Sequence, residues 1–265
     1  MGYQIGFIGC GNMGGALARA VCNAIGGNNV AVCDYDMAKT NALQKEFGAT
    51  PLSVADVAKQ CKFIVLGIKP QNASETTAQI KDVLQTRKDA VVITMMAGVS
   101  TTAIQAFLGA NLPVIRIMPN TPACLGAGMI LYTTLGVDED TEREFLACFA
   151  KAGKVDKLPE EKIDGASALS GCGPAFVYAF AEALADAGVE CGLTRDKANL
   201  YAAQTLLGSA EMLLQFGHPA DLKDAVCSPG GTTIAGMHAL ENAGFRGAVM
   251  DAVTSAYKRT LELKK

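Results

Sequence analysis

Three glycines near the N-terminus form the most specific chemical signal in this chain. Gly9, Gly11 and Gly14 directly follow the apolar segment 3–8 and have the spacing GxGxxG. In a turn from a strand into a helix, the first glycine permits the tight turn and the second lets the backbone approach a pyrophosphate. The third lets the helix pack closely on the strand, and the phosphates rest at the helix N-terminus. The pattern predicts a dinucleotide site with contacts from Gly9, Cys10, Gly11, Asn12, Met13 and Gly14.

GxGxxG alone is a weak motif, so the elements on either side of the turn decide whether it indicates a dinucleotide site. A helix is expected over 13–25, and a second strand over 30–33 ends in Asp34, 20 positions beyond Gly14. An acidic side chain at that distance meets the adenosine ribose of a bound dinucleotide. We prefer this interpretation to a glycine-rich turn that merely packs tightly.

Three further loops follow strands that are expected at 63–66, 91–94 and 113–118. Ligands of open α/β sheets bind beyond the carboxyl ends of the strands, so these loops should line one crevice with the glycine turn. Lys69 is expected to orient a ribose or the nicotinamide amide, and Asn120 to hydrogen-bond the same end; alternatively, each is an ordinary turn residue. The methionines after the 91–94 strand are expected to form an adaptable apolar wall. The predicted cofactor contacts in these loops are Lys69, Pro70, Met95, Ala97 and Asn120.

The order of elements predicts two domains. Up to about residue 157, short β-branched runs alternate with helical stretches, which indicates a parallel sheet flanked by helices. The last two strands, 129–134 and 154–156, are expected to close the sheet with a change of strand direction. Beyond them, helices are predicted over 160–187, 195–216, 219–226, 232–243 and 245–263. The predicted fold is an α/β Rossmann-type N-terminal domain, residues 1–158, with an all-α C-terminal dimerisation domain, residues 159–265.

The helical half is expected to need a partner. Its segment 195–216 carries apolar residues on more than one side, and a domain of about 105 residues struggles to cover such a helix alone. We therefore predict an obligate homodimer built on this half.

Composition excludes several classes of function. The net charge is −3 with both signs interspersed, which argues against nucleic acid and against a polybasic membrane patch. Nine cysteines without a CxxC pair and two histidines without HExxH disfavour a metal site, and free thiols in a reducing compartment are expected. The first strand begins within three residues of the N-terminus, so no signal peptide is expected and the cytoplasm is the predicted location. The apolar stretch 174–188 contains two acidic residues and is interpreted as a core helix.

Two loops of small residues, 170–174 and 227–233, interrupt the helical half. In 227–233, glycines allow successive backbone N–H groups to point the same way at a helix start, which suits a small carboxylate. Without further context, however, a Pro-Gly-Gly helix start is usually just a turn.

Taken together, these motifs resemble pyrroline-5-carboxylate reductase, the family that completes proline synthesis. The resemblance runs the length of the chain and is most specific at its last segment. The segments that carry it are 6–14, 68–70, 97–99, 118–122, 169–175, 208–210 and 222–233.

The resemblance implies hydride transfer from NADPH or NADH to the C=N bond of 1-pyrroline-5-carboxylate, giving L-proline, without a metal ion. It also implies a homodimer with interlocked helical domains, often assembled into a decamer as a pentamer of dimers, with each site shared between chains. Thr233 is the implied catalytic residue, with its hydroxyl nearest the imine. The residues implied to bind substrate are Ser228, Gly230, Gly231, Thr232 and Thr233.

One departure and two alternatives bear on this resemblance. Cys172 stands where the family often has serine; we interpret it as a small isostere, because no activating base is close in sequence. A β-hydroxyacid dehydrogenase typically has a catalytic lysine in the corresponding helix, and 173–180 contains none. The intact loop 228–233 argues against a non-catalytic nucleotide-sensing protein.

Cofactor preference gives a first prediction. Asp34-Tyr35 stands where NADP-binding relatives commonly have a neutral residue followed by arginine. Repulsion between Asp34 and a 2′-phosphate is about 4 kcal/mol at most for unit charges about 4 Å apart at an effective dielectric of about 20, and solvent reduces it to about 1–2 kcal/mol. We expect NADH to be used at least as well as NADPH in initial-rate measurements. A KM for NADPH far below that for NADH contradicts the argument.

Overall fold

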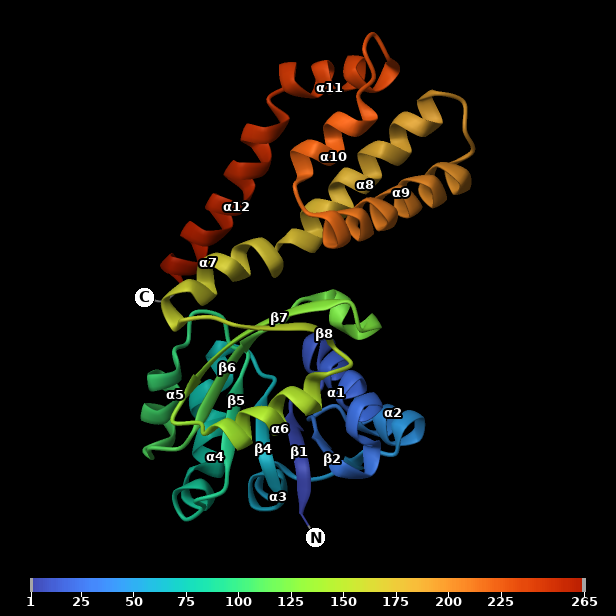
Figure 1. Ribbon diagram of the computed structural model, residues 1–265. Coiled ribbons are helices and arrows are strands. Elements are labelled where there is room, and N and C mark those ends of the chain that lie inside the picture. The colour runs from blue at the N-terminus through green and yellow to red at the C-terminus, as the bar shows by residue number, and fades with distance from the viewer. Residues whose placement is uncertain (1, 264–265) are drawn as a thin grey trace. The chain divides into compact units, whose positions relative to one another are not determined.

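The computed structural model describes residues 2–263, which divide into two compact units. Of the described residues, unit 1 contains 2–172 together with 256–263, and unit 2 is Gly173–Ser255. Figure 1 labels most of the helices and strands.

Unit 1 is built on one sheet of eight strands in the order β3-β2-β1-β4-β5-β6-β7-β8 (Figure 1). The strands are β1 (Tyr3–Ile8), β2 (Val30–Cys33), β3 (Thr50–Pro51), β4 (Cys61–Leu66), β5 (Val91–Thr94), β6 (Val114–Met118), β7 (Gly128–Leu135) and β8 (Gly153–Lys157). Every neighbouring pair is parallel except β6 and β7, which are antiparallel. The predicted Rossmann-type sheet is confirmed, and so is the change of strand direction near its end.

Helices cover both faces of the sheet. The helices of unit 1 are α1 (Asn12–Ile25), α2 (Met37–Phe47), α3 (Val54–Gln60), α4 (Ala73–Gln85), α5 (Thr101–Leu108), α6 (Glu139–Phe149) and α7 (Glu160–Ser170), with the short 3₁₀ turns η1 (Gly27–Asn29), η2 (Pro70–Asn72) and η3 (Thr121–Leu125). Helices α1, α2 and α6 contribute to one apolar core, and α3, α4 and α5 to the other.

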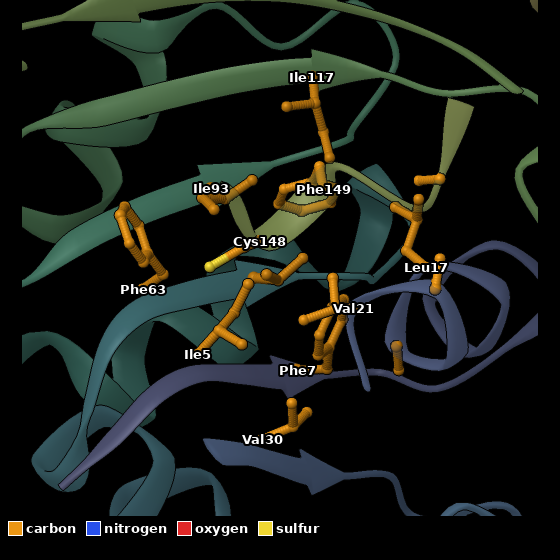
Figure 2. Close-up of a cluster of buried hydrophobic side chains, with 14 of the residues drawn as sticks. Ile5, Phe7, Leu17, Val21, Val30, Phe63, Ile93, Ile117, Cys148 and Phe149 are labelled. Atoms are coloured by element: carbon orange, nitrogen blue, oxygen red, sulfur yellow. The ribbon is translucent and has the colours of Figure 1, made fainter. Parts of the chain in front are cut away.

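Consecutive residues of the central strands enter these two cores alternately. Phe63 of β4 packs in the first core with Leu17 and Phe149 (Figure 2), whereas its neighbour Ile64 packs in the second. Successive strand side chains point to opposite faces, so a strand that is buried on both faces has a continuous apolar sequence. This is why the runs at 63–66 and 91–94 were recognisable as strands.

The register of the parallel strands aligns their carboxyl ends along one edge of the sheet. Ile8 of β1 pairs with Cys33 of β2 and with Leu66 of β4. Leu66 pairs in turn with Thr94 of β5, and Thr94 pairs with Arg116 of β6. The loops that follow these five strands therefore leave from the same edge, where open α/β sheets bind their ligands.

A buried arginine fastens α7 to the sheet. Nη2 of Arg116 donates to Oδ1 of Asp164 at 2.6 Å, and the two side chains are 1% and 2% exposed. Nη1 of Arg116 lies 3.5 Å from Oε1 of Glu160. Charged groups are buried at low cost only when they are paired and hydrogen-bonded, so this arrangement fixes the position of α7 against β6.

Unit 2 consists of helices that bury little apolar surface of their own. It contains α8 (Gly173–Glu190), α9 (Arg195–Phe216), α10 (Pro219–Val226), α11 (Thr232–Asn242) and most of α12 (Phe245–Glu262). In the fully described segment 173–255, the buried hydrophobic residues are Ala185, Ala198 and Ala202. Leu200, Leu207 and Leu214, spaced seven residues apart on α9, are 63%, 53% and 82% exposed. These leucines need a neighbour that the single chain does not provide.

The structure differs from the sequence-based expectation around residue 171. The single helix expected over 160–187 is two helices, α7 and α8, separated by a turn at Gly171 and Cys172. Two glycines flank Cys172, and glycine is a poor helix former, which accounts for the break at this point. Helix α7 packs with the sheet and falls in unit 1, so the two compact units divide after Cys172. The domain boundary that we expect at 158/159 stays a prediction.

The Arg116 contact gives a prediction for stability. Arg116→Ala removes the buried guanidinium that pairs with Asp164 and Glu160 and is expected to lower the free energy of unfolding by about 3–5 kcal/mol in urea titrations. The matched control is Arg143→Ala, which removes an exposed ion pair with Asp140 and should change stability by less than about 0.5 kcal/mol. Equal stabilities of the two variants would contradict this account.

Candidate active site

Close packing around Gly9 explains two of the three motif glycines. Gly9 has φ +98°, and a Cβ there would clash with the carbonyl oxygen of Gly67. A Cβ on Gly14 would clash with the carbonyl oxygen of Gly9. The turn and the close approach of helix to strand, which the motif predicts, are thus both observed in the structure.

Gly11 differs, because no contact among the described residues requires a glycine at this position. Its φ is −65°, which any residue adopts, and an added Cβ would meet no atom within 4 Å. Gly11 is also the N-cap of α1, whose first turn has no side-chain cap and no acidic residue. This open space beside free helix N–H groups fits a pyrophosphate that approaches the backbone.

The Asp34 carboxylate is already engaged within the protein. The backbone N–H of Cys10 donates to its Oδ2 at 2.7 Å, and the backbone N–H of Asp36 donates to its Oδ1 at 2.9 Å. Nζ of Lys39 lies 3.5 Å from Oδ1, and the Asp34 side chain is 3% exposed. The ammonium group offsets part of the negative charge that a 2′-phosphate would meet. The ribose contact of Asp34 stays a prediction.

Cys10 does not add negative charge next to the phosphate cradle. Burial, together with the neighbouring Asp34 carboxylate, raises the pKa of its thiol to about 12. The thiol is therefore neutral at physiological pH, which suits a position beside bound phosphates and does not suit a nucleophile.

Two cavities lie along this edge of unit 1 and share a wall. The β2-side cavity, about 560 Å³, is lined by residues that include Asp34, Tyr35 and Lys39. The β5-side cavity, about 550 Å³, is lined by residues that include Met95, Ala97 and Pro119. The residues common to both are Gly11, Gly67, Ile68 and Lys69. A dinucleotide has two ends joined by a pyrophosphate, and two adjoining cavities that meet at Gly11 match this shape.

Lys69 and Asn120 have different places at this edge. Lys69 lines both cavities, as a residue that contacts the middle of a dinucleotide should. Asn120 lines neither of these two: its Nδ2 donates to the carbonyl of Ser170 at 3.0 Å, and its Oδ1 accepts from the backbone N–H of Met129 at 2.9 Å. Its predicted cofactor hydrogen bond remains untested.

The sequence reasoning missed one wall of the β2-side cavity. This wall comes from η2 and α4 and comprises Gln71, Asn72, Glu75, Thr76 and Gln79. Glu75 and Gln79 are four residues apart on a helix that begins just after Lys69-Pro70, and that spacing places them on one face. Polar residues at this spacing, shortly after a predicted ligand loop, are the sequence signal from which this wall could have been predicted.

The small-residue loop of unit 2 is a tight turn that leads into a helix. The N–H of Gly231 donates to the carbonyl of Ser228 at 3.0 Å, and Gly230 has φ +68°. Pro229 followed by a glycine with positive φ is the signature of a type II turn. A Cβ on Gly231 would clash with Oγ of Ser228, and α11 then begins at Thr232 without a side-chain cap or an acidic first turn. Ser228, Thr232 and Thr233 are exposed in the single chain.

Comparison with known proteins gives the family. Residues 160–263 match the family described as pyrroline-5-carboxylate reductase dimerisation, and residues 4–98 match NADP oxidoreductase coenzyme F420-dependent. The chain is 39% identical over 267 residues to the pyrroline-5-carboxylate reductase of Glycine max, covering 98% of this chain and 96% of that protein. It is 38% identical over 271 residues to the Escherichia coli (strain K12) reductase, covering 100% of both. The chain belongs to the pyrroline-5-carboxylate reductase family.

Solved structures agree with this assignment. The crystal structure of Plasmodium falciparum pyrroline carboxylate reductase with NADP bound has a TM-score of 0.88 at 31% identity and covers 99% of this chain and 98% of that one. The Coxiella burnetii pyrroline-5-carboxylate reductase has a TM-score of 0.90 at 31% identity and covers 100% of both chains. As a member of this reductase family, the chain is an NAD(P)H-dependent oxidoreductase. Its predicted dimerisation half coincides with the dimerisation region of the family.

Gly11 and Gly14 give a matched pair of variants. Gly11→Ala fills the open cradle, so we expect the Kd for NADPH to rise at least about tenfold while stability falls by about 1 kcal/mol or less. Gly14→Ala forces a clash with Gly9 and should cost about 1–3 kcal/mol of stability. Nucleotide titration by fluorescence and thermal unfolding measure the two effects. Wild-type NADPH affinity in Gly11→Ala would argue against a phosphate at this position.

Proposed function

We propose that this chain reduces the C=N bond of 1-pyrroline-5-carboxylate with NADH or NADPH and releases L-proline. The observation that carries the proposal is the Ser228–Thr233 turn, because it is the part of the helical half suited to a small carboxylate. Family membership and the open Gly11 cradle support the same conclusion.

The cofactor would lie along the strand edge of unit 1. Backbone N–H groups at the start of α1 would bind its pyrophosphate, and Asp34 and Lys69 would orient its riboses. Pro70, Met95 and Ala97 would pack near its nicotinamide end. When bound, the reduced nicotinamide supplies a hydride for the carbon of the C=N bond.

The substrate would be held by the turn of unit 2. Backbone N–H groups of Gly230 and Thr232, with the hydroxyl of Ser228, would bind the carboxylate. Gly231, whose N–H donates to the carbonyl of Ser228, would hold the turn in this shape. The Thr233 hydroxyl would face the ring nitrogen. Hydride addition to the carbon leaves the nitrogen needing one proton, unless it is already protonated as an iminium.

The protein needs no strong acid or base for this reaction. An iminium carbon is already electrophilic, so alignment of two rings and neutralisation of a carboxylate supply most of the required assistance. Thr233 therefore acts by orienting the nitrogen and helping to conduct a proton, with water as the final source.

The exposed apolar helices of unit 2 support assembly into a homodimer. Further assembly into a pentamer of dimers is proposed from the family resemblance alone. Residues 160–190 are long and apolar enough, by length and composition, to cross a membrane. The same residues fall in the region that matches the dimerisation family, so we propose a second copy of the chain as their cover. We also propose a cytoplasmic location, which suits nine free cysteines.

Thr233→Ala tests both the reaction and its proposed catalytic residue. With NADH and 1-pyrroline-5-carboxylate as substrates and proline identified as the product, kcat/KM should fall about tenfold to a thousandfold, because an orienting hydrogen bond is lost. The Kd for NADH should not change. Thr86→Ala, an exposed threonine at the end of α4, is the matched control. Unchanged kinetics would remove Thr233 from the mechanism, and absence of wild-type turnover would remove the proposed substrate.

A further inference from the structure

The first turn of α7 is bonded to the start of α5. The backbone N–H and the hydroxyl of Thr101 donate to Oε1 and Oε2 of Glu160, both at 2.8 Å. Thr101 is the first residue of α5, and Met95, Met96 and Ala97, just before it in the chain, line the β5-side cavity. A carboxylate at a helix N-terminus binds free N–H groups and complements the helix dipole. Glu160 therefore fixes the point at which this cavity loop ends.

The last turn of α7 is bonded to the loop after β6. Asn120 donates to the carbonyl of Ser170 and accepts from the N–H of Met129, so its amide joins α7 to β7. The two residues before it, Met118 and Pro119, line the same β5-side cavity. Asn120, which is 8% exposed, thus fixes the Met118-Pro119 loop of this cavity through its contacts with α7 and β7.

Arg116 completes the attachment between these two points. Its buried guanidinium contacts both Asp164 and Glu160, so α7 is held in register along its length. The helix contacts loops on the β5 side, whereas the Asp34 carboxylate on the β2 side is held by Cys10, Asp36 and Lys39. The two ends of the cofactor site therefore have separate supports.

We propose that α7 holds in position the two loops that line the nicotinamide half of the cofactor site. Glu160 and Asn120 are the positioning residues. Glu160 acts through Thr101 on the Met95–Ala97 loop, and Asn120 acts on the Met118-Pro119 loop. Neither residue has to touch the cofactor. The inference rests on the proposed function only in assigning the β5-side cavity to the nicotinamide.

Two variants weaken the bonds between α7 and the cavity loops while keeping the size of the side chain. Glu160→Gln keeps the shape but cannot accept both hydrogen bonds from Thr101, and it removes the charge facing Arg116. Asn120→Asp still accepts from Met129 but cannot donate to Ser170. Glu161→Gln is the matched control, because Glu161 is the adjacent exposed glutamate on α7.

Three measurements on the full-length protein distinguish misplacement of the nicotinamide-side loops from destabilisation of the whole cofactor site. The Kd for ADP-ribose, which has no nicotinamide, reports the β2 side, the Kd for NADH reports both sides, and kcat reports alignment. Misplacement of reacting groups by about 1 Å costs up to about a hundredfold in rate, so we expect kcat to fall about tenfold to a hundredfold in both variants. The ADP-ribose Kd should stay within about twofold, and the NADH Kd should rise by about three- to tenfold through lost preorganisation.

Amide hydrogen exchange supplies a readout that does not require turnover. In Glu160→Gln, exchange should become faster at 96–103 and stay as in Glu161→Gln at 10–15. Unchanged kcat with unchanged exchange, or an equal loss of ADP-ribose and NADH affinity, overturns the inference. If wild-type protein binds NADH but reduces no imine, the proposed function fails, while the affinity ratio and the exchange pattern still decide the role of α7.

Discussion

The site depends first on the contact between two backbone segments at Gly9 and Gly67. Their carbonyl groups approach so closely that a Cβ on either residue would clash with the carbonyl oxygen of the other. This contact brings the start of α1 beside the loop after β4, where Gly11 and Gly67 line both cavities. The parallel register of the strands then brings the remaining loops to the same edge.

Charge is distributed along this edge so that the phosphate cradle stays free of negative charge. The carboxylate of Asp34 accepts two backbone N–H groups and lies near the ammonium of Lys39. The neighbouring Cys10 thiol stays protonated because its pKa is raised to about 12 by burial and by Asp34. The first turn of α1 adds no acidic residue. The anion binding predicted here would therefore rest on backbone N–H groups and the helix dipole, with little competing negative charge from neighbouring side chains.

The two units supply different parts of the chemistry and are stabilised differently. Unit 1 has two apolar cores and carries the cofactor edge. Unit 2 carries the Ser228–Thr233 turn on helices whose large apolar side chains are exposed in the single chain. Because the fully buried hydrophobic residues of unit 2 are three alanines, its helices gain little stability from apolar contacts within the single chain. Association with a second copy should therefore stabilise unit 2, including its Ser228–Thr233 turn.

The sequence by itself determined the glycine turn, the central strands and the ligand loops, since each is encoded in a few neighbouring residues. Only the tertiary structure decided the break of the predicted 160–187 helix after Ser170, the cavity wall from Glu75 and Gln79, and the partners of Asn120. Its bond to Ser170 spans 50 residues, and the bond between Thr101 and Glu160 spans 59. Local patterns specify backbone conformation and burial, whereas a hydrogen bond between remote residues depends on how the elements pack together. The sequence therefore predicted which loops form the candidate site, and the fold decided which remote side chains contact those loops.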